Sequence, residues 1–379
     1  MSVLGHSGHS GHSGHSGHSG HSGHSGHSGH SGGAVDEGLY PSALATTAEG
    51  IIGFWDGTSS RNPKVRDGGW DDFARLGEDF RPLVLRHEIS AMFTATKASG
   101  GTLGVAAAGF TGASPLLTLT PPTAAHLAAQ LKYLRTAADL RGDRMAEIVA
   151  QMSDLPAFFA AQFFLTPERK KWTLVLMQAL YDAVILPEMR LKLFVSAPRP
   201  IDFSTQVQPI LPTPAHSAYP SGHATESFAF ATLLALLNLA AQGEAAPVTR
   251  LLGLLTGGGS AADLMPFRLA ARIADNRTVA GVHFPVDSAH GALLGFSCTL
   301  AFAARAMPGI ATIPTWNAVA GDWTTDFTLG RWTNALAVGA WQIAPGGGAG
   351  TLQIDNTSAP RSLLGLLWDH AVAEWQLDL

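Results

Sequence analysis

Apolar residues recur at helical spacing through most of the chain that follows Pro121-Pro122. Between residues 126 and 152 the recurring positions are Leu127, Leu131, Leu134, Leu140 and Ile148, with an interruption at Gly142. Spacings of three and four residues place such side chains on one face of an α-helix. The pattern therefore predicts an all-α fold, a helical bundle.

Start and stop signals divide the later chain into separate helices. Thr166-Pro167-Glu168 is typical of a helix start, with a Thr cap, proline at the first position and an acid in the first turn. We expect this helix to run to about Leu186, to kink at Pro187 and to continue to Lys192. Three further helices are predicted over residues 223–242, 260–274 and 287–307, the first of them ended by Gly243.

Composition shifts along the chain predict four segments. Residues 1–33 contain a His-Ser-Gly repeat that cannot bury a core, so we expect a disordered tail that resembles a purification tag. Residues 34–120 are turn-rich, and we expect irregular structure with short helices, one of them around residues 81–93. Residues 121–310 form the predicted helical core that carries the candidate chemistry, and residues 311–379 a C-terminal segment that packs on it.

The C-terminal segment is rich in tryptophan. Six of the nine tryptophans lie beyond residue 310, and Trp368 and Trp375 are seven residues apart, on one face of a predicted terminal helix. Packing onto the bundle is the preferred interpretation. An oligomer contact or a lid over the site is the alternative, so a homo-oligomer remains open.

Composition limits the classes of partner. Apolar residues make up 46% of the chain, charged residues 14%, and the formal net charge is −5, which gives no basic footprint for nucleic acid. The apolar run from Phe228 to Ala241 is shorter than the ~20 residues that cross a bilayer, so no transmembrane segment is expected. The single cysteine, Cys298, excludes an intramolecular disulfide and is interpreted as a core residue. No export signal is visible, so the default location is the cytoplasm, although the repeat tail could have replaced such a signal.

Three stretches carry residues suited to a tetrahedral oxyanion. The first contains Lys192 and Arg199-Pro200, the second is Pro220-Ser221-Gly222-His223, and the third contains Arg277, His283 and Asp287. Cations and the amide groups at a helix start bind anions, and glycine lets the backbone approach closely. Asp287, four residues after His283, is placed to fix the tautomer of that imidazole.

The pattern K-x6-R-P, then P-S-G-H, then R-x5-H-x3-D resembles the signature of a superfamily. That superfamily joins vanadium-dependent haloperoxidases to type 2 phosphatidic acid phosphatases and bacterial acid phosphatases. Within it, this chain is most similar to the bacterial branch without membrane spans. Asn276 departs from the phosphatase branch, which usually has Ser there.

The resemblance implies a role for each residue. Lys192, Arg199 and Arg277 would neutralise the anion, Ser221 and Gly222 would donate to it, and His223 would be the general acid and base. His283 would be the axial group, either the only protein ligand of vanadium or the nucleophile that forms a phosphohistidine. The implied cofactor is vanadate, whose site phosphate can also occupy.

Several residues have two interpretations at this stage. His216 matches a histidine of bromoperoxidase-type members and would tune the bound cofactor, or it is a loop histidine bonded to the backbone. Glu226 would orient His223, or it favours the helix dipole, which we prefer. Asp275 is a candidate ion partner of Arg277 or Arg272. His87, His126, His290 and His370 lack ligand-spaced partners and are interpreted as surface or satisfied core residues.

Three functional hypotheses follow from the sequence. The preferred one is a vanadate-dependent haloperoxidase whose substrates are hydrogen peroxide and a halide. The alternative is an acid phosphatase of the same superfamily, which acts on a phosphoester through His283. A non-catalytic oxyanion-binding protein is the third, and the pair His223 and His283 argues against it because binding alone needs no acid–base group.

Overall fold

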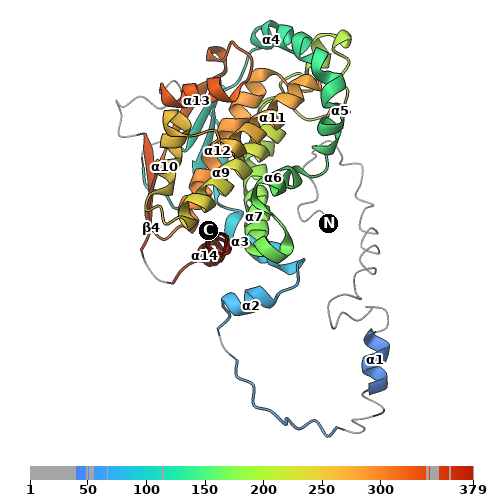
Figure 1. The fold of residues 1–379 in the computed structure, drawn as a ribbon, viewed down its shortest axis with the longest axis vertical. Helices are drawn as coiled ribbons and strands as arrows, with labels where there is room; N and C mark the ends of the chain where they lie inside the picture. The colour runs from blue at the N-terminus through green and yellow to red at the C-terminus, as the bar shows by residue number, and fades with distance from the viewer. Residues whose placement is uncertain are drawn as a thin grey trace. The chain divides into compact units, whose positions relative to one another are not determined.

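The computed structural model describes residues 40–47, 50, 55–65, 67–112, 115–338, 341, 350–357 and 360–378. The predicted tail, residues 1–33, lies outside this range. Two units are distinguished, and α1 (Tyr40–Thr47) belongs to the unit of residues 11–68. All other helices and strands belong to the unit that contains Gly69–Leu379, which is predominantly α-helical, as the sequence predicts (Figure 1).

Three helices form the centre of this unit and pack side by side in Figure 1: α9 (Gly222–Ala241), α11 (Met265–Val279) and α12 (Pro285–Ala306). Nearly every residue of α9 and α12 is buried, which explains why their sequences are apolar on all sides. α9 is the one described helix long and apolar enough to cross a membrane. Within its most apolar window, 89% of the residues are buried inside the protein, as expected of a core helix.

Glycines bring α9 and α12 into backbone contact. A Cβ atom added at Gly291 would lie 2.4 Å from the carbonyl oxygen of Ser221, and one at Gly295 would lie 2.0 Å from that of Thr225. A larger residue at either place would force the helices apart. The close approach places the first turns of the two helices together.

The end of α9 is formed by local chemistry. Gly243 adopts the left-handed conformation (φ +79°) that glycine tolerates. Its N–H donates to the carbonyl of Ala240, and the N–H of Glu244 donates to that of Leu239, the pattern of a Schellman motif. The predicted stop at Gly243 is therefore confirmed.

The long helix α7 (Pro167–Phe194) packs against α9 and begins at the predicted proline. Its non-helical dihedral angles are at Lys170 (φ −133°, ψ 40°), whereas the helix continues through Pro187, where the kink is predicted. Thr166 makes no side-chain cap hydrogen bond. α7 ends four residues before Pro198, and Arg199 starts the short helix α8 (Pro200–Phe203) after an extended link.

Several shorter helices complete the sequence up to α12. α4 (Ala124–Ala137) and α5 (Arg141–Ala150) are separated by the 3-10 turn η3 (Ala138–Leu140), so the break precedes Gly142. The others are α2 (Trp70–Arg75), α3 (Phe80–Ile89), α6 (Leu155–Phe163), η4 (Thr205–Val207), α10 (Pro247–Gly253) and the π-helical η5 (Leu254–Gly258). α11 begins five residues later than predicted and extends through Arg277.

The sequence analysis missed six strands. A four-stranded sheet has the order β1 (Phe93–Lys97), β2 (Leu103–Ala107), β3 (Leu117–Thr120) and β5 (Trp316–Val319). β5 runs parallel to β3, with Leu117 opposite Trp316, and the other pairs are antiparallel. A second pair joins β4 (Gly309–Pro314) to β6 (Thr351–Asn356). The segment called irregular thus supplies three of the strands.

The C-terminal helices pack on the same core. They are α13 (Leu329–Ala337), after the 3-10 turn η6 (Ala320–Asp322), and α14 (Leu363–Gln376), which contacts α7, α9 and α12. All six C-terminal tryptophans are buried: Trp316, Trp323, Trp332, Trp341, Trp368 and Trp375. Their burial accounts for this cluster by packing.

Candidate oxyanion site

The first turns of α9 and α12 meet at one place. The backbone N–H of Ser221 donates to the carbonyl of Asp287 over 3.0 Å. This bond ties the PSGH turn to the start of the helix that follows His283. Residues 66 positions apart in the sequence are thereby fixed beside each other.

A small cavity of about 40 Å³ opens at this junction. Its polar lining comes from Arg199, His216, Gly222, His223, Arg277 and His283. Its rim is apolar and comes from Met152, Leu211, Pro212, Pro214 and Val282. Six of the nine residues singled out in the sequence therefore surround one space.

His283 is held on both ring nitrogens. Its Nδ1 lies 3.3 Å from Oδ2 of Asp287, and its Nε2 lies 3.1 Å from Nη1 of Arg199. Burial lowers the pKa of His283 well below its usual value, and the positive charges of Arg199 and Lys192 lower it further. A neutral ring that donates from Nδ1 to Asp287 makes Nε2 the acceptor of a hydrogen bond from Nη1 of Arg199, on the side of the ring that lines the cavity.

Asp287 is fully buried in the first turn of α12. Its Oδ2 accepts from the N–H of Phe284 over 2.9 Å. Burial nevertheless raises the pKa of Asp287 to about 7, against the hydrogen bond from Phe284 and the charge of Arg199, which lower it. We infer a hydrogen bond to a neutral His283 as the main role, since the lowered pKa of the ring disfavours an ion pair.

Arg199 is presented from the extended link before α8. Its guanidinium donates to the carbonyl groups of Val282, His216 and Ser217 over 2.8 to 3.3 Å. Burial lowers the pKa of Arg199 to about 10, which still leaves it charged at neutral pH. Arg199 is thus fixed against His283 by the backbone of two separate loops.

Arg277 lies in the last turn of α11 and is 1% exposed. Its Nη2 donates to Oε1 of Gln151 over 2.7 Å and to the carbonyl of Ile148 over 3.2 Å. Its buried Nε has no hydrogen-bond partner among the described residues. The burial that excludes water from this cation also lowers its pKa to about 10.

Gln151, at the end of α5, was missed by the sequence analysis. Its Oε1 accepts from Arg277 and, over 3.1 Å, from Nδ2 of Asn276, and its carbonyl lies 3.2 Å from Nε2 of His223. Asn276 also donates to Glu147 over 2.7 Å. One residue thus positions a cation and the predicted acid–base group. No motif marks a lone glutamine at a helix end, so the sequence offered no signal.

Lys192 lies behind the cavity and does not line it. Its Nζ donates to the carbonyl of Pro220, the first residue of the PSGH turn, and, over 3.4 Å, to that of Ser217 in the preceding loop. Glu188, one helical turn earlier on α7, places Oε1 3.8 Å from the same Nζ. The predicted cation is therefore beside the site, with a buried carboxylate that the sequence analysis did not identify.

Ser221 and Gly222 begin α9. Ser221 is the N-cap, and its buried Oγ has no hydrogen-bond partner among the described residues. Its backbone N–H is bonded to Asp287, so it is the hydroxyl that remains to donate to a ligand. Gly222 lines the cavity itself.

His216 contacts the site directly. Its Nδ1 lies 3.2 Å from Nη2 of Arg199, and its ring lines the cavity. Its carbonyl also accepts from the same guanidinium. Three imidazoles, those of His216, His223 and His283, therefore surround this space.

Other candidates lie elsewhere. Asp275 pairs with Arg144 over 2.5 Å, and Arg272 pairs with Glu147 over 2.9 Å, so neither predicted partner of Asp275 is its ion-pair partner.

Three other histidines make packing or local contacts. His290 is buried with Nδ1 2.6 Å from the hydroxyl of Tyr219, and His370 stacks on Trp70 with ring centres 3.9 Å apart. The side chain of His126 contacts Gln130 over 3.0 Å. Within the described residues no group of three or more His, Cys, Asp or Glu is placed to hold a metal ion.

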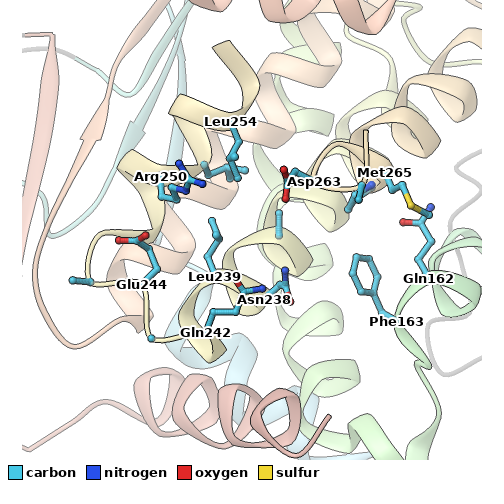
Figure 2. Close-up of a pocket in the computed structure, with 16 residues that line it drawn as sticks. Gln162, Phe163, Asn238, Leu239, Gln242, Glu244, Arg250, Leu254, Asp263 and Met265 are labelled. Carbon is cyan, nitrogen blue, oxygen red and sulfur yellow. The ribbon is translucent and has the colours of Figure 1, made fainter. Parts of the chain in front are cut away.

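A larger cavity, of about 590 Å³, lies at the opposite end of α9 (Figure 2). Figure 2 shows Asn238 and Gln242 from α9, with Arg250 on one side and Phe163 on the other. None of the residues predicted from the three stretches lines it. The larger cavity and the predicted site residues therefore lie at opposite ends of α9.

One comparison with known proteins gives a family match. Residues 170–307 match the family model described as the PAP2 superfamily, and this range includes every predicted site residue. The chain therefore carries a PAP2 superfamily domain, the superfamily of phosphatases and haloperoxidases. A comparison with curated proteins gives no significant match.

Proposed function

We propose, taking residues 170–307 as a PAP2 superfamily domain, that the chain is a vanadate-dependent haloperoxidase that oxidises halide with hydrogen peroxide. The observation that carries the proposal is the third imidazole at the site. His216 contacts Arg199 and lines the cavity together with His223 and His283, the two histidines that phosphoryl transfer requires. The small cavity suits an oxyanion with small inorganic substrates.

The buried donors fit vanadate. Nε of Arg277 and Oγ of Ser221 are buried donors without a partner among the described residues, and Gly222 lines the cavity between the helices. A buried donor without an acceptor costs about 1–3 kcal/mol, which an anion at this place would recover. Lys192, Arg199 and Arg277 would supply the positive charge. Nε2 of His283 would be the ligand and would exchange its hydrogen bond from Arg199 for the bond to the metal. Bound vanadate supplies a Lewis acid that activates peroxide and keeps its oxidation state.

The side chains of the protein position the reactants and transfer protons. The overall reaction consumes halide, hydrogen peroxide and one proton and yields hypohalous acid and water. His223, fixed by the carbonyl of Gln151, is the group placed to hand protons to and from the peroxide oxygens. Arg199 keeps His283 in the neutral form, and the apolar rim limits the entry of water.

A phosphatase is the second candidate, and the match to the PAP2 superfamily favours it. In that reaction Nε2 of His283 attacks phosphorus, His223 protonates the leaving ester oxygen, and water then cleaves the phosphohistidine. The same donors would stabilise the transition state, because a five-coordinate phosphorus carries its charge on the same equatorial oxygens.

One pair of assays separates the two candidates. We expect the protein, stripped of oxyanion and loaded with vanadate, to halogenate a phenolic dye with bromide and hydrogen peroxide. Phosphate should inhibit competitively because it needs the same donors. If vanadate-loaded protein shows no peroxide-dependent halogenation, and vanadate-free protein hydrolyses an aryl phosphate at roughly 1–10³ per second, the phosphatase assignment replaces the haloperoxidase. His216→Ala should lower the halogenation rate, and unchanged halogenation would remove the support from His216.

A further inference from the structure

Glu188 is a buried carboxylate that neither proposed reaction uses. It lies on α7, is fully buried, and neither of its carboxylate oxygens has a hydrogen-bond partner among the described residues. Its charged neighbour is Lys192, with Oε1 3.8 Å from Nζ. A carboxylate removed from water without hydrogen bonds is costly as an anion, so its position needs an explanation.

Glu188 packs against the start of α9. A Cβ atom at Gly222 would lie 2.9 Å from Oε1 of Glu188, so the missing side chain of Gly222 makes room for the carboxylate. Gly222 also lines the oxyanion cavity. The carboxylate therefore lies directly behind the backbone that an oxyanion would contact.

Among the described residues, buried cations and buried carboxylates occur in equal number around the site. Three buried cations, Lys192, Arg199 and Arg277, share this region with three buried carboxylates, Glu188, Glu226 and Asp287. A doubly charged oxyanion would bring two more negative charges into the same low-dielectric volume. Repulsion between like charges there favours the protonated form of a nearby carboxyl.

We propose that Glu188 is a positioning residue that serves as the counter-ion of Lys192 in the free site and takes up a proton when an oxyanion binds. Protonation frees the charge of Lys192 for the anion. The step forms an O–H bond on Glu188 with a proton from solvent, and no electrons are transferred. The inference rests on the proposed function, since it needs an oxyanion at the cavity.

The ionisation of the pair is suited to this exchange. Burial raises the pKa of Glu188 to about 7, and the charge of Lys192 opposes this rise. Burial lowers the pKa of Lys192 to about 8, and the charge of Glu188 opposes this fall. The other groups that act on the pair are Glu226 on α9, Tyr181 on α7, Asp287 on α12 and Arg199. Near neutral pH, therefore, burial opposes the charged form of both groups, and each charge favours the charged form of its partner in the free site.

The test uses tungstate, a tetrahedral oxyanion that keeps its double charge in this range, with the full-length chain at about pH 7.5. Calorimetry in two buffers of different ionisation heat gives the protons taken up on binding, and we expect about one per anion. Infrared difference spectra should show a protonated carboxylic acid band on addition of tungstate. The band should vanish in Glu188→Gln and return in Glu188→Asp.

Asp182→Asn is the matched control. Asp182 lies on α7, as Glu188 does, and its carboxylate pairs with Arg86 of α3. It should leave both signals unchanged. Binding of tungstate without proton uptake, or a band that persists in Glu188→Gln, overturns the role of Glu188 alone. Absence of tungstate binding overturns the proposed function as well. If Glu188→Gln does not fold, the wild-type proton count and band still decide.

Discussion

The two ends of α9 face cavities of opposite character. At its start, Gly222 and His223 face about 40 Å³ surrounded by buried cations and imidazoles. At its end, Asn238 and Gln242 face about 590 Å³ lined mainly by neutral groups, with Glu244, Arg250 and Asp263 as the charged ones (Figure 2). Cavity volume alone would therefore place the functional site at the wrong end of α9. Chemistry on an oxyanion needs donors whose water has already been removed, and these are gathered at the small end.

The difference arises from how each helix end is satisfied. The end of α9 closes on itself through Gly243 and Glu244, so its carbonyl groups need no ligand. At the start of α9, the hydroxyl of Ser221 and Nε of Arg277 have no hydrogen-bond partner among the described residues, whereas at the large cavity the buried atom without a partner is an acceptor, Oε1 of Gln162. Buried donors without partners therefore favour an anion at the start of α9.

The largest expected effect follows from removing the axial histidine. His283→Ala should abolish turnover and vanadate retention, because the remaining donors hold anion oxygens and none can bond the central atom. Activity assays and vanadium content after gel filtration measure both. Gln242→Ala, at the other end of α9, is the control and should keep full activity. Wild-type turnover in His283→Ala would refute the axial role.

The acid–base histidine should give a smaller loss. His223→Ala should lower kcat by roughly 10²–10⁴ while tungstate still binds, since the cations and Ser221 remain. Steady-state kinetics and calorimetry separate the two effects. A loss of binding that matches the loss of rate would show that His223 holds the anion and does not transfer protons.

The shared frame of α9 and α12 can be tested by adding one methyl group. Gly295→Ala would place Cβ 2.0 Å from the carbonyl oxygen of Thr225, so the helices must separate. We expect the free energy of unfolding to fall by about 1–3 kcal/mol, measured by urea denaturation. Gly253→Ala, with no atom within 4 Å of the new Cβ, is the control and should change stability little. Equal stability of both variants would contradict the proposed close packing.

The smallest effect is a pH dependence of stability. Burial raises the pKa of Glu188 from 4.5 to about 7, so the folded protein binds this proton more tightly than the unfolded chain does. The contribution to stability is fully present below about pH 4.5 and is lost as the pH rises through about 7. Relative to wild type, Glu188→Gln should therefore gain stability as the pH rises across this window. Urea unfolding without oxyanion at several pH values measures it, and a constant difference would contradict it.

The sequence predicted well where local signals determine structure. The Thr-Pro start of α7, the glycine stop of α9 and the apolar runs of α9 and α12 all correspond to observed helices. Six of the site residues also line one cavity, and all of them except His216 lie at a helix end or next to one.

What the sequence missed depends on contacts between distant segments. The strands β1 and β2 are short and pair with each other, and β3 pairs with β5 almost 200 residues later. Gln151 contacts Arg277 across 126 positions. Glu188 is placed next to the site only by its packing against Gly222, which belongs to another helix. Asp275 likewise pairs with Arg144, a residue that no local spacing connects to it.

The location of bound vanadate tests the central claim most directly. A crystal structure of the full-length chain with vanadate should show the metal bonded to Nε2 of His283, with its oxygens near Arg277, Ser221 and Gly222. Vanadate bound at the other end of α9, beside Arg250, or bound at the start of α9 without a bond to His283, would contradict the account.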